Sequence, residues 1–192
     1  MNTTMIKLYS KSLALVLVIA VSASAINVNA EISPQKMADA IYAVIQSDRE
    51  VYTKNVVNRL QNEEEVIMAD EHWEDEQALP LPAQMLRMGA AGVAEKNLGV
   101  TYSLMSTWPI NSQNKPVTNV EKKGLEYVVA NPSKSFYSEE TLGEELYFTA
   151  VYPDNAVSAA CINCHNDHQD SPKADFELGD VMGGVVLRIK LD

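Results

Sequence analysis

Between residues 34 and 62 the apolar positions recur mostly three and four residues apart, which is the period of a helix with one buried face. Ser33 followed by Pro34 provides an N-cap and a proline at the first helical position. The acidic run at residues 63–65 opposes the dipole of a helix ending there. The sequence therefore predicts one long amphipathic helix that begins at Pro34 and ends near this run. Its apolar stripe comprises Met37, Ile41, Val44, Ile45, Val51, Tyr52, Val56 and Leu60.

A second helix is predicted over residues 83–97. The segment Leu79-Pro80-Leu81-Pro82 ends any preceding helix and begins a new one. Gly89 and Gly92 interrupt this helix, and each costs about 1 kcal/mol relative to alanine in a helix interior. Close approach of another element, a helix or a cofactor, would account for the two glycines. A short or loosely packed helix would account for them equally well.

Three later segments alternate between apolar and polar residues and are predicted to be strands. They cover residues 100–106, 145–152 and 180–191, and Pro153 is expected to end the second. Gly183-Gly184 in the third indicates a bulge or close contact with another backbone.

Short helices are expected between these strands. Thr118 and Glu121 form a capping box that begins a helix ending before Pro132, and another short helix is expected over residues 155–165. Helices come first and strands follow without regular crossovers, which favours an α+β fold with an antiparallel sheet. The long first helix is expected to pack across this sheet or against a second copy of the chain.

Residues 1–30 have the features of a secretory signal peptide. Lys7 and Lys11 precede an unbroken apolar run from Leu13 to Val21, and small residues allow cleavage after Ala25 or Ala30. The apolar run falls short of the roughly 20 residues that span a bilayer. We therefore expect export to the bacterial periplasm, no membrane span after cleavage, and a single domain over residues 31–192.

Composition narrows the possible partners. The 192 residues have a formal net charge of −11, and 46% of them are hydrophobic, as in a globular domain. An acidic surface repels phosphate backbones, so we expect no nucleic-acid partner. The charge could attract a basic protein, or it could serve solubility alone.

The candidate chemistry lies at Cys161-Ile162-Asn163-Cys164-His165, since Cys-x-x-Cys-His is the attachment sequence of a c-type haem. The two thiols form thioethers to the haem, and the histidine becomes the proximal iron ligand. A thioredoxin-like redox pair would need a βαβ setting, and a zinc site would need two further ligands. These two cysteines are the only ones in the chain. Because haem is attached outside the cytoplasm, the signal peptide and the motif support each other, and one covalent haem c is predicted.

The chain also resembles the Tll-type haem domain, a bacterial family with a PAS-like fold and one c-type haem. The resemblance implies a haem beside a small antiparallel sheet flanked by helices, a sensing or redox role, and possible pairing of two copies through the N-terminal helix. Some members take the distal iron ligand from an upstream cysteine, which this chain lacks. The resemblance rests on Val51-Tyr52-Thr53, Leu79 to Ala83, Tyr102 to Ser106, Asn111, Asn114, Glu121, Tyr147 to Pro153, Cys161 to His165 and Gly179-Asp180-x-x-Gly183-Gly184.

The ligand on the other side of the iron is left open by the sequence. His168 follows His165 by three residues and would lie on the same side of the haem. The weak candidates are His72, Met85 and Met88; an exposed histidine and core methionines are the ordinary interpretations of these residues. Met105 and Met182 are ordinary core candidates as well.

Three functions are compatible with one haem in one domain. The first is electron transfer or redox sensing through a partner protein, because a single haem has no internal route for electrons. The alternative is a sensor of a diatomic gas, which needs an open or displaceable sixth ligand. Peroxidase chemistry ranks last, since only His72, Arg59 and Arg87 are obvious distal donors and no motif links them. We therefore do not expect an enzyme.

Overall fold

The structure is a computed structural model that describes residues 31–191, so the predicted signal peptide lies outside the described residues. The predicted first helix is confirmed as α1 (Pro34–Val51), which continues directly into η1 (Tyr52–Glu63). The Ser33 side chain accepts a hydrogen bond from the Lys36 amide at 3.2 Å, as expected of an N-cap. From Tyr52 onward the helix has the wider π pattern, which the sequence does not predict. At this junction the Thr53 hydroxyl donates to the Arg49 carbonyl at 2.7 Å, a contact that bends and loosens helices.

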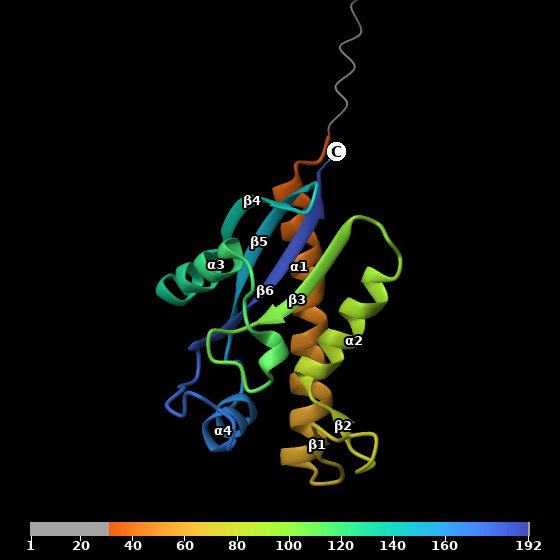
Figure 1. Ribbon diagram of the computed structural model, residues 1–192. Coiled ribbons are helices and arrows are strands. Elements are labelled where there is room, and N and C mark those ends of the chain that lie inside the picture. Colours follow the sequence, from red (N-terminus) through yellow and green to blue (C-terminus); the bar gives the residue numbers. More distant parts are fainter. Residues whose placement is uncertain (1–30, 192) are drawn as a thin grey trace, which may run out of the picture. The chain divides into compact units, whose positions relative to one another are not determined.

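Four antiparallel strands form the central sheet in the order β3-β6-β5-β4 (Figure 1). They are β3 (Val100–Met105), β4 (Phe136–Leu142), β5 (Glu145–Asn155) and β6 (Val181–Lys190). A short parallel bridge joins β1 (Ala69–Asp70) to β2 (Leu79–Pro80). The remaining elements are α2 (Pro82–Ala94), η2 (Ser112–Asn114), α3 (Asn119–Ala130) and α4 (Ala159–Asp167). The predicted α+β class with an antiparallel sheet is confirmed.

Two helices cover opposite faces of the sheet (Figure 1). On one face α1 packs Ala38 against Leu187 and Tyr152, and on the other α3 packs Leu125 against Val186. Alternate residues of β5 and β6 therefore supply two separate cores, as the period of a strand requires. Of the two arrangements expected for the first helix, the structure has it packed across the sheet.

The sequence missed one strand and misplaced the end of another. β4 pairs with β5 from Phe136 opposite Val151 to Leu142 opposite Glu145, although its middle is polar. β5 continues through Pro153 to Asn155, so the expected stop at Pro153 is wrong. The Pro153 carbonyl accepts from the Tyr42 hydroxyl at 3.1 Å, and β4 begins opposite Val151 and so does not reach Pro153. Pro153 has no amide hydrogen to donate, but because β4 does not extend beside it, no hydrogen bond between β4 and β5 is lost there.

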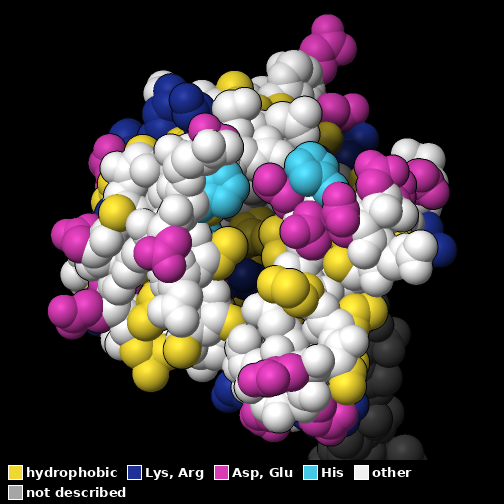
Figure 2. All heavy atoms as spheres, turned by 90° about the horizontal axis from the view of Figure 1, so that it is seen from below, with side chains coloured by type: hydrophobic (Ala, Val, Ile, Leu, Met, Phe, Trp, Pro, Cys, Tyr) yellow, Lys and Arg dark blue, Asp and Glu magenta, His cyan; other side chains and the backbone are white. Residues whose placement is uncertain are grey.

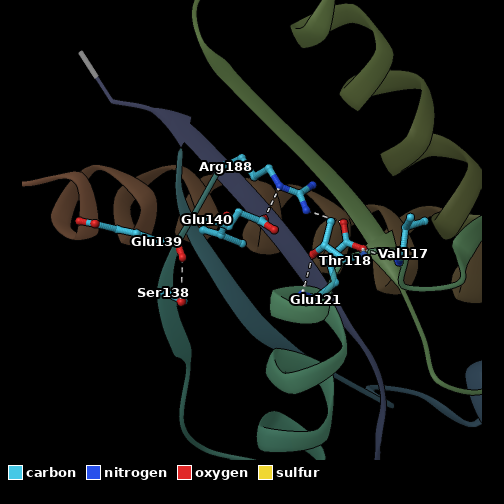
Figure 3. Close-up of polar contacts among 8 residues, drawn as sticks. Val117, Thr118, Glu121, Ser138, Glu139, Glu140 and Arg188 are labelled. Carbon is cyan, nitrogen blue, oxygen red and sulfur yellow. Dashed lines mark hydrogen bonds and ion pairs between the residues drawn. The ribbon is translucent and has the colours of Figure 1, made fainter. Parts of the chain in front are cut away.

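An ion network fastens α3 to the sheet (Figure 3). Arg188 on β6 donates through Nε to Glu140 of β4 at 2.8 Å and forms a second ion pair with Glu121 of α3. Glu121 also accepts from the Thr118 amide at 2.8 Å, while its own amide donates to the Thr118 hydroxyl at 3.1 Å. The predicted capping box is confirmed, and its glutamate has a second function in the core.

Glycines allow close packing at two of the expected places. An added Cβ at Gly183 would lie 2.4 Å from the Met105 carbonyl oxygen, and one at Gly89 would lie 2.7 Å from the Tyr102 hydroxyl. Gly92 has nothing within 4 Å of such a Cβ. Close approach therefore accounts for Gly89, where the neighbour is a side chain of β3, and does not account for Gly92.

Candidate functional site

A cavity of about 400 Å³ lies at the end of the sheet where β3 and β5 finish and β6 begins. Its walls come from α1 with η1, from α2, from the loop after β3 and from α4. Figure 2 shows this hollow, with hydrophobic atoms on its walls and histidine and acidic side chains around its mouth. The volume lies within the range of sites for small molecules and cofactors.

Helix α4 is held against this cavity by the segment that follows it. The Asn166 side chain donates to the Phe176 carbonyl and accepts from the Phe176 amide, both at 2.9 Å. Phe176 is buried with Ala156 and Met182, and its ring lies edge-on to the His165 ring at 6.0 Å. The position of α4 is therefore fixed by contacts with residues beyond it in the chain.

Cys161, Cys164 and His165, the residues of the predicted haem motif, all line the cavity. Both cysteines are free thiols; Cys161 is half-buried, with its Sγ 3.4 Å from the Ser158 hydroxyl oxygen, and Cys164 is exposed. Burial raises the pKa of the Cys164 thiol, and the nearby Glu71 raises it further. Both effects favour the neutral, protonated form of the Cys164 thiol on the surface of the cavity.

His165 has the character of an uncharged ligand. Burial lowers the pKa of its imidazole below the ordinary value, which favours the neutral ring. Its Nδ1 is buried and has no hydrogen-bond partner within the described residues. A neutral imidazole with an unused nitrogen is the form in which histidine binds a metal ion.

The wall supplied by α1 and η1 is a row of side chains spaced four residues apart. In a regular α-helix, side chains four residues apart point about 40° apart around the helix axis, so a row with this spacing drifts around the helix. The wider turn of η1 reverses this drift, so the row continues along the cavity. π-Helical turns occur often at functional sites. The row consists of Ile45, Arg49, Thr53, Val57 and Gln61.

Arg49 is the charged member of this row, and the sequence analysis did not single it out. Its Nη1 forms an ion pair with Asp154 at the end of β5. Burial acts to lower the pKa of Arg49, but the neighbouring Asp154 outweighs burial and the pKa is raised. Its Nε is buried and has no hydrogen-bond partner among residues 31–191. The sequence did contain a signal for Arg49, because this basic residue follows Ile45 of the apolar helical stripe by four positions.

The weak candidates for the distal ligand do not line the cavity. The His72 side chain is 71% exposed, and its Nε2 lies 3.6 Å from Glu71. Met85 and Met88 lie on α2 outside the cavity lining, and Met88 is exposed. His168 does line the cavity, and its Nε2 lies 3.8 Å from a carboxylate oxygen of Glu71. The positions of His72, Met85 and Met88 thus give no support to the ligand role considered for them.

Two further methionines, Met105 and Met182, also line the cavity. Within residues 31–191 no group of three or more His, Cys, Asp and Glu side chains is placed to hold a metal ion by itself. The described residues therefore offer no arrangement that supports the zinc alternative for the two cysteines.

Two comparisons with known proteins concern the family and the fold of the chain. A family model described as Tll0287-like (Tll0287) matches residues 26–190. The chain belongs to the Tll0287-like family. This Tll0287-like chain is also similar to a solved structure described as the crystal structure of the cyanobacterial heme-protein Tll0287. The two are 14% identical with a TM-score of 0.54, and the likeness covers 83% of this chain and 98% of that one. It shows a shared fold, and the resemblance drawn from the sequence is confirmed.

No curated protein matches the Tll0287-like chain. Along residues 31–191 none of its helices is both long enough and apolar enough to cross a bilayer.

Proposed function

We propose that Cys161 and Cys164 attach one haem covalently and that His165 is an axial ligand of its iron. The observation that carries this proposal is that one short helix, α4, presents all three side chains to one cavity. When bound, haem supplies a one-electron couple at iron and, where one axial position is free, a site for small gases.

The residues of the cavity fit such a group. Each thioether requires addition of an S–H across a carbon–carbon double bond: the sulfur bonds to one carbon and the hydrogen goes to its neighbour. No oxidant or reductant is consumed, so the two free thiols suffice. The half-buried His165, whose lowered pKa favours the neutral ring, provides the nitrogen donor. Membership of a family that includes a heme-protein gives independent support.

We further propose that the protein works in the periplasm, in electron transfer or redox sensing through a redox or signalling partner. The predicted signal peptide supports export, and one attachment motif supports a single haem with no internal electron relay. The net charge of −11 is compatible with a partner that presents a basic surface. Sensing of a diatomic gas is the alternative that the spectra below distinguish.

Covalent attachment is tested by denaturing the full chain after production in a bacterium with working cytochrome c assembly. We expect the haem to remain with the polypeptide in the wild type and to be lost in Cys161→Ala/Cys164→Ala. Asn163→Ala is the matched control, because it changes the exposed residue between the cysteines and leaves both thiols in place. Covalent haem in the double variant, or a colourless wild type, would refute the attachment.

The axial role is tested by visible spectra of ferric and ferrous protein. His165→Ala should keep covalent haem but change the spectrum, whereas His168→Ala, on the same cavity, should leave it unchanged. The reverse pattern would refute the assignment of His165. Spectra with CO and NO then separate the two roles: a six-coordinate spectrum indifferent to the gases supports electron transfer. A high-spin spectrum that shifts on adding gas supports the sensor.

A further inference from the structure

Arg49 has a donor for which the described chain provides no acceptor. Its Nη1 is engaged by Asp154, while its Nε is buried in the same cavity wall and makes no hydrogen bond within residues 31–191. Leaving a buried donor without an acceptor costs about 1–3 kcal/mol. A molecule in the cavity that carries an acceptor at this position would remove that cost.

The charges around Arg49 indicate the class of acceptor. One carboxylate, Asp154, already balances its charge. The other acidic residues of the lining have different partners: Glu50 pairs with Lys54, and Glu71 lies near His168. The planar guanidinium donates in fixed directions that match a carboxylate, and its charge is weakly hydrated. A half-buried arginine whose buried Nε carries a spare N–H is therefore suited to a second carboxylate.

Arg49 lines the same cavity as the two cysteines but comes from a different wall. Arg49 lies on the row from α1 and η1, whereas Cys161, Cys164 and His165 come from α4, and all four line one cavity. Figure 2 shows basic atoms within the hollow, whose lining includes both Arg49 and Arg87.

We propose that Arg49 binds a carboxylate of the molecule that fills this cavity; if the proposed function is right, this is one of the carboxylate side chains of the haem. Asp154 then acts as a positioning residue that holds the guanidinium through Nη1 and leaves Nε in the cavity wall free to donate. The alternative explanation is that Arg49 serves only to neutralise Asp154.

The test uses resonance Raman spectroscopy of the full chain with its haem. The bending band of the haem carboxylate groups responds to hydrogen bonds made to their oxygens, and a merely structural role of Arg49 would not move it. We expect Arg49→Met to shift this band to lower frequency. Arg87→Met is the matched control, because Arg87 also lines the cavity but is exposed and donates to Gln113 at 2.9 Å. The control should leave the band where it is.

Two outcomes would overturn the inference. The first is an unchanged band in Arg49→Met. The second is a shift of equal size in Arg87→Met, because the band would then respond to loss of any positive charge on the cavity lining and not to a hydrogen bond from Arg49. Should Arg49→Met fail to fold with Asp154 unpaired, Arg49→Met/Asp154→Asn removes both charges and gives the same comparison.

Covalent haem is measured first in every sample, so the two proposals fail in different ways. Absence of covalent haem from the wild type refutes the proposed function. Covalent haem in all samples together with an unmoved band refutes only the role of Arg49.

Discussion

The ion network at Arg188 gives the sharpest test of how the sheet and α3 are held together. Replacing Arg188 by methionine keeps most of the aliphatic volume and removes the cation between Glu121 and Glu140 (Figure 3). The side chains of Glu121 and Glu140 are only 3% and 6% exposed, so both carboxylates would stay buried without their counter-ion. Removing one partner of a buried ion pair typically costs about 3–5 kcal/mol.

The remaining hydrogen bonds place Arg188→Met at the lower end of that range. Glu121 keeps the amides of Val117 and Thr118 as donors, and Glu140 keeps the Thr149 hydroxyl at 2.8 Å. We therefore expect the free energy of unfolding to fall by about 3 kcal/mol at pH 7. For a domain of this size that loss corresponds to a melting temperature lower by roughly 6–12 °C.

The loss should depend on pH. In the wild type, burial acts to raise the pKa of Glu140, but hydrogen bonds from Thr149 and Arg188 outweigh burial and lower it. This contribution to stability is present above the ordinary carboxyl pKa and disappears as the pH falls through the lowered pKa. Without Arg188 burial persists, so Glu140 should take up a proton more readily and the variant should recover part of its deficit at pH 5.

Urea unfolding followed by far-ultraviolet circular dichroism, at pH 5 and pH 7.5, measures both effects. Lys54→Met is the control, because Lys54 pairs with Glu50 on the exposed side of the helix, where such a pair contributes about 0.3–0.5 kcal/mol. A deficit for Arg188→Met below about 1 kcal/mol at pH 7.5, or one equally large at pH 5, would refute the reasoning.

Two further predictions concern the elements that shape the cavity. Gly183→Ala should lower stability by about 1–3 kcal/mol, because its Cβ would lie 2.4 Å from a backbone oxygen of β3. Gly92→Ala, with nothing within 4 Å, should raise stability by about 0.5–1 kcal/mol, and equal effects of the two in urea unfolding would contradict this account. Burial raises the pKa of Tyr42 to about 12. The wild-type minus Tyr42→Phe difference in phenolate absorbance should therefore be absent at pH 10.5, and a phenolate signal there would contradict the burial of this hydroxyl.

Features governed by residues close together in the sequence were predicted well. The N-cap at Ser33, the capping box at Thr118 and the helix that carries Cys161 to His165 each depend on a few neighbouring side chains, and all three are present. β4 was missed because its middle, Ser138-Glu139-Glu140, has no apolar alternation. It is a strand because a hairpin places it beside β5, and because Glu140 meets Arg188 from a strand 48 residues away.

The two walls of the cavity also differ in how far apart in the sequence their residues lie. On α4 the candidate residues lie within five consecutive positions, so the sequence alone was enough to propose both thiols and the imidazole. On the opposite wall Arg49 meets Asp154 across 105 residues, and the row to which it belongs repeats every four residues, a spacing at which successive side chains drift around a regular α-helix. A π-helical segment is needed to continue that row along the cavity. The side facing α4 therefore depends on backbone geometry and on a distant strand end, and its residues could be identified only when the fold brought them together.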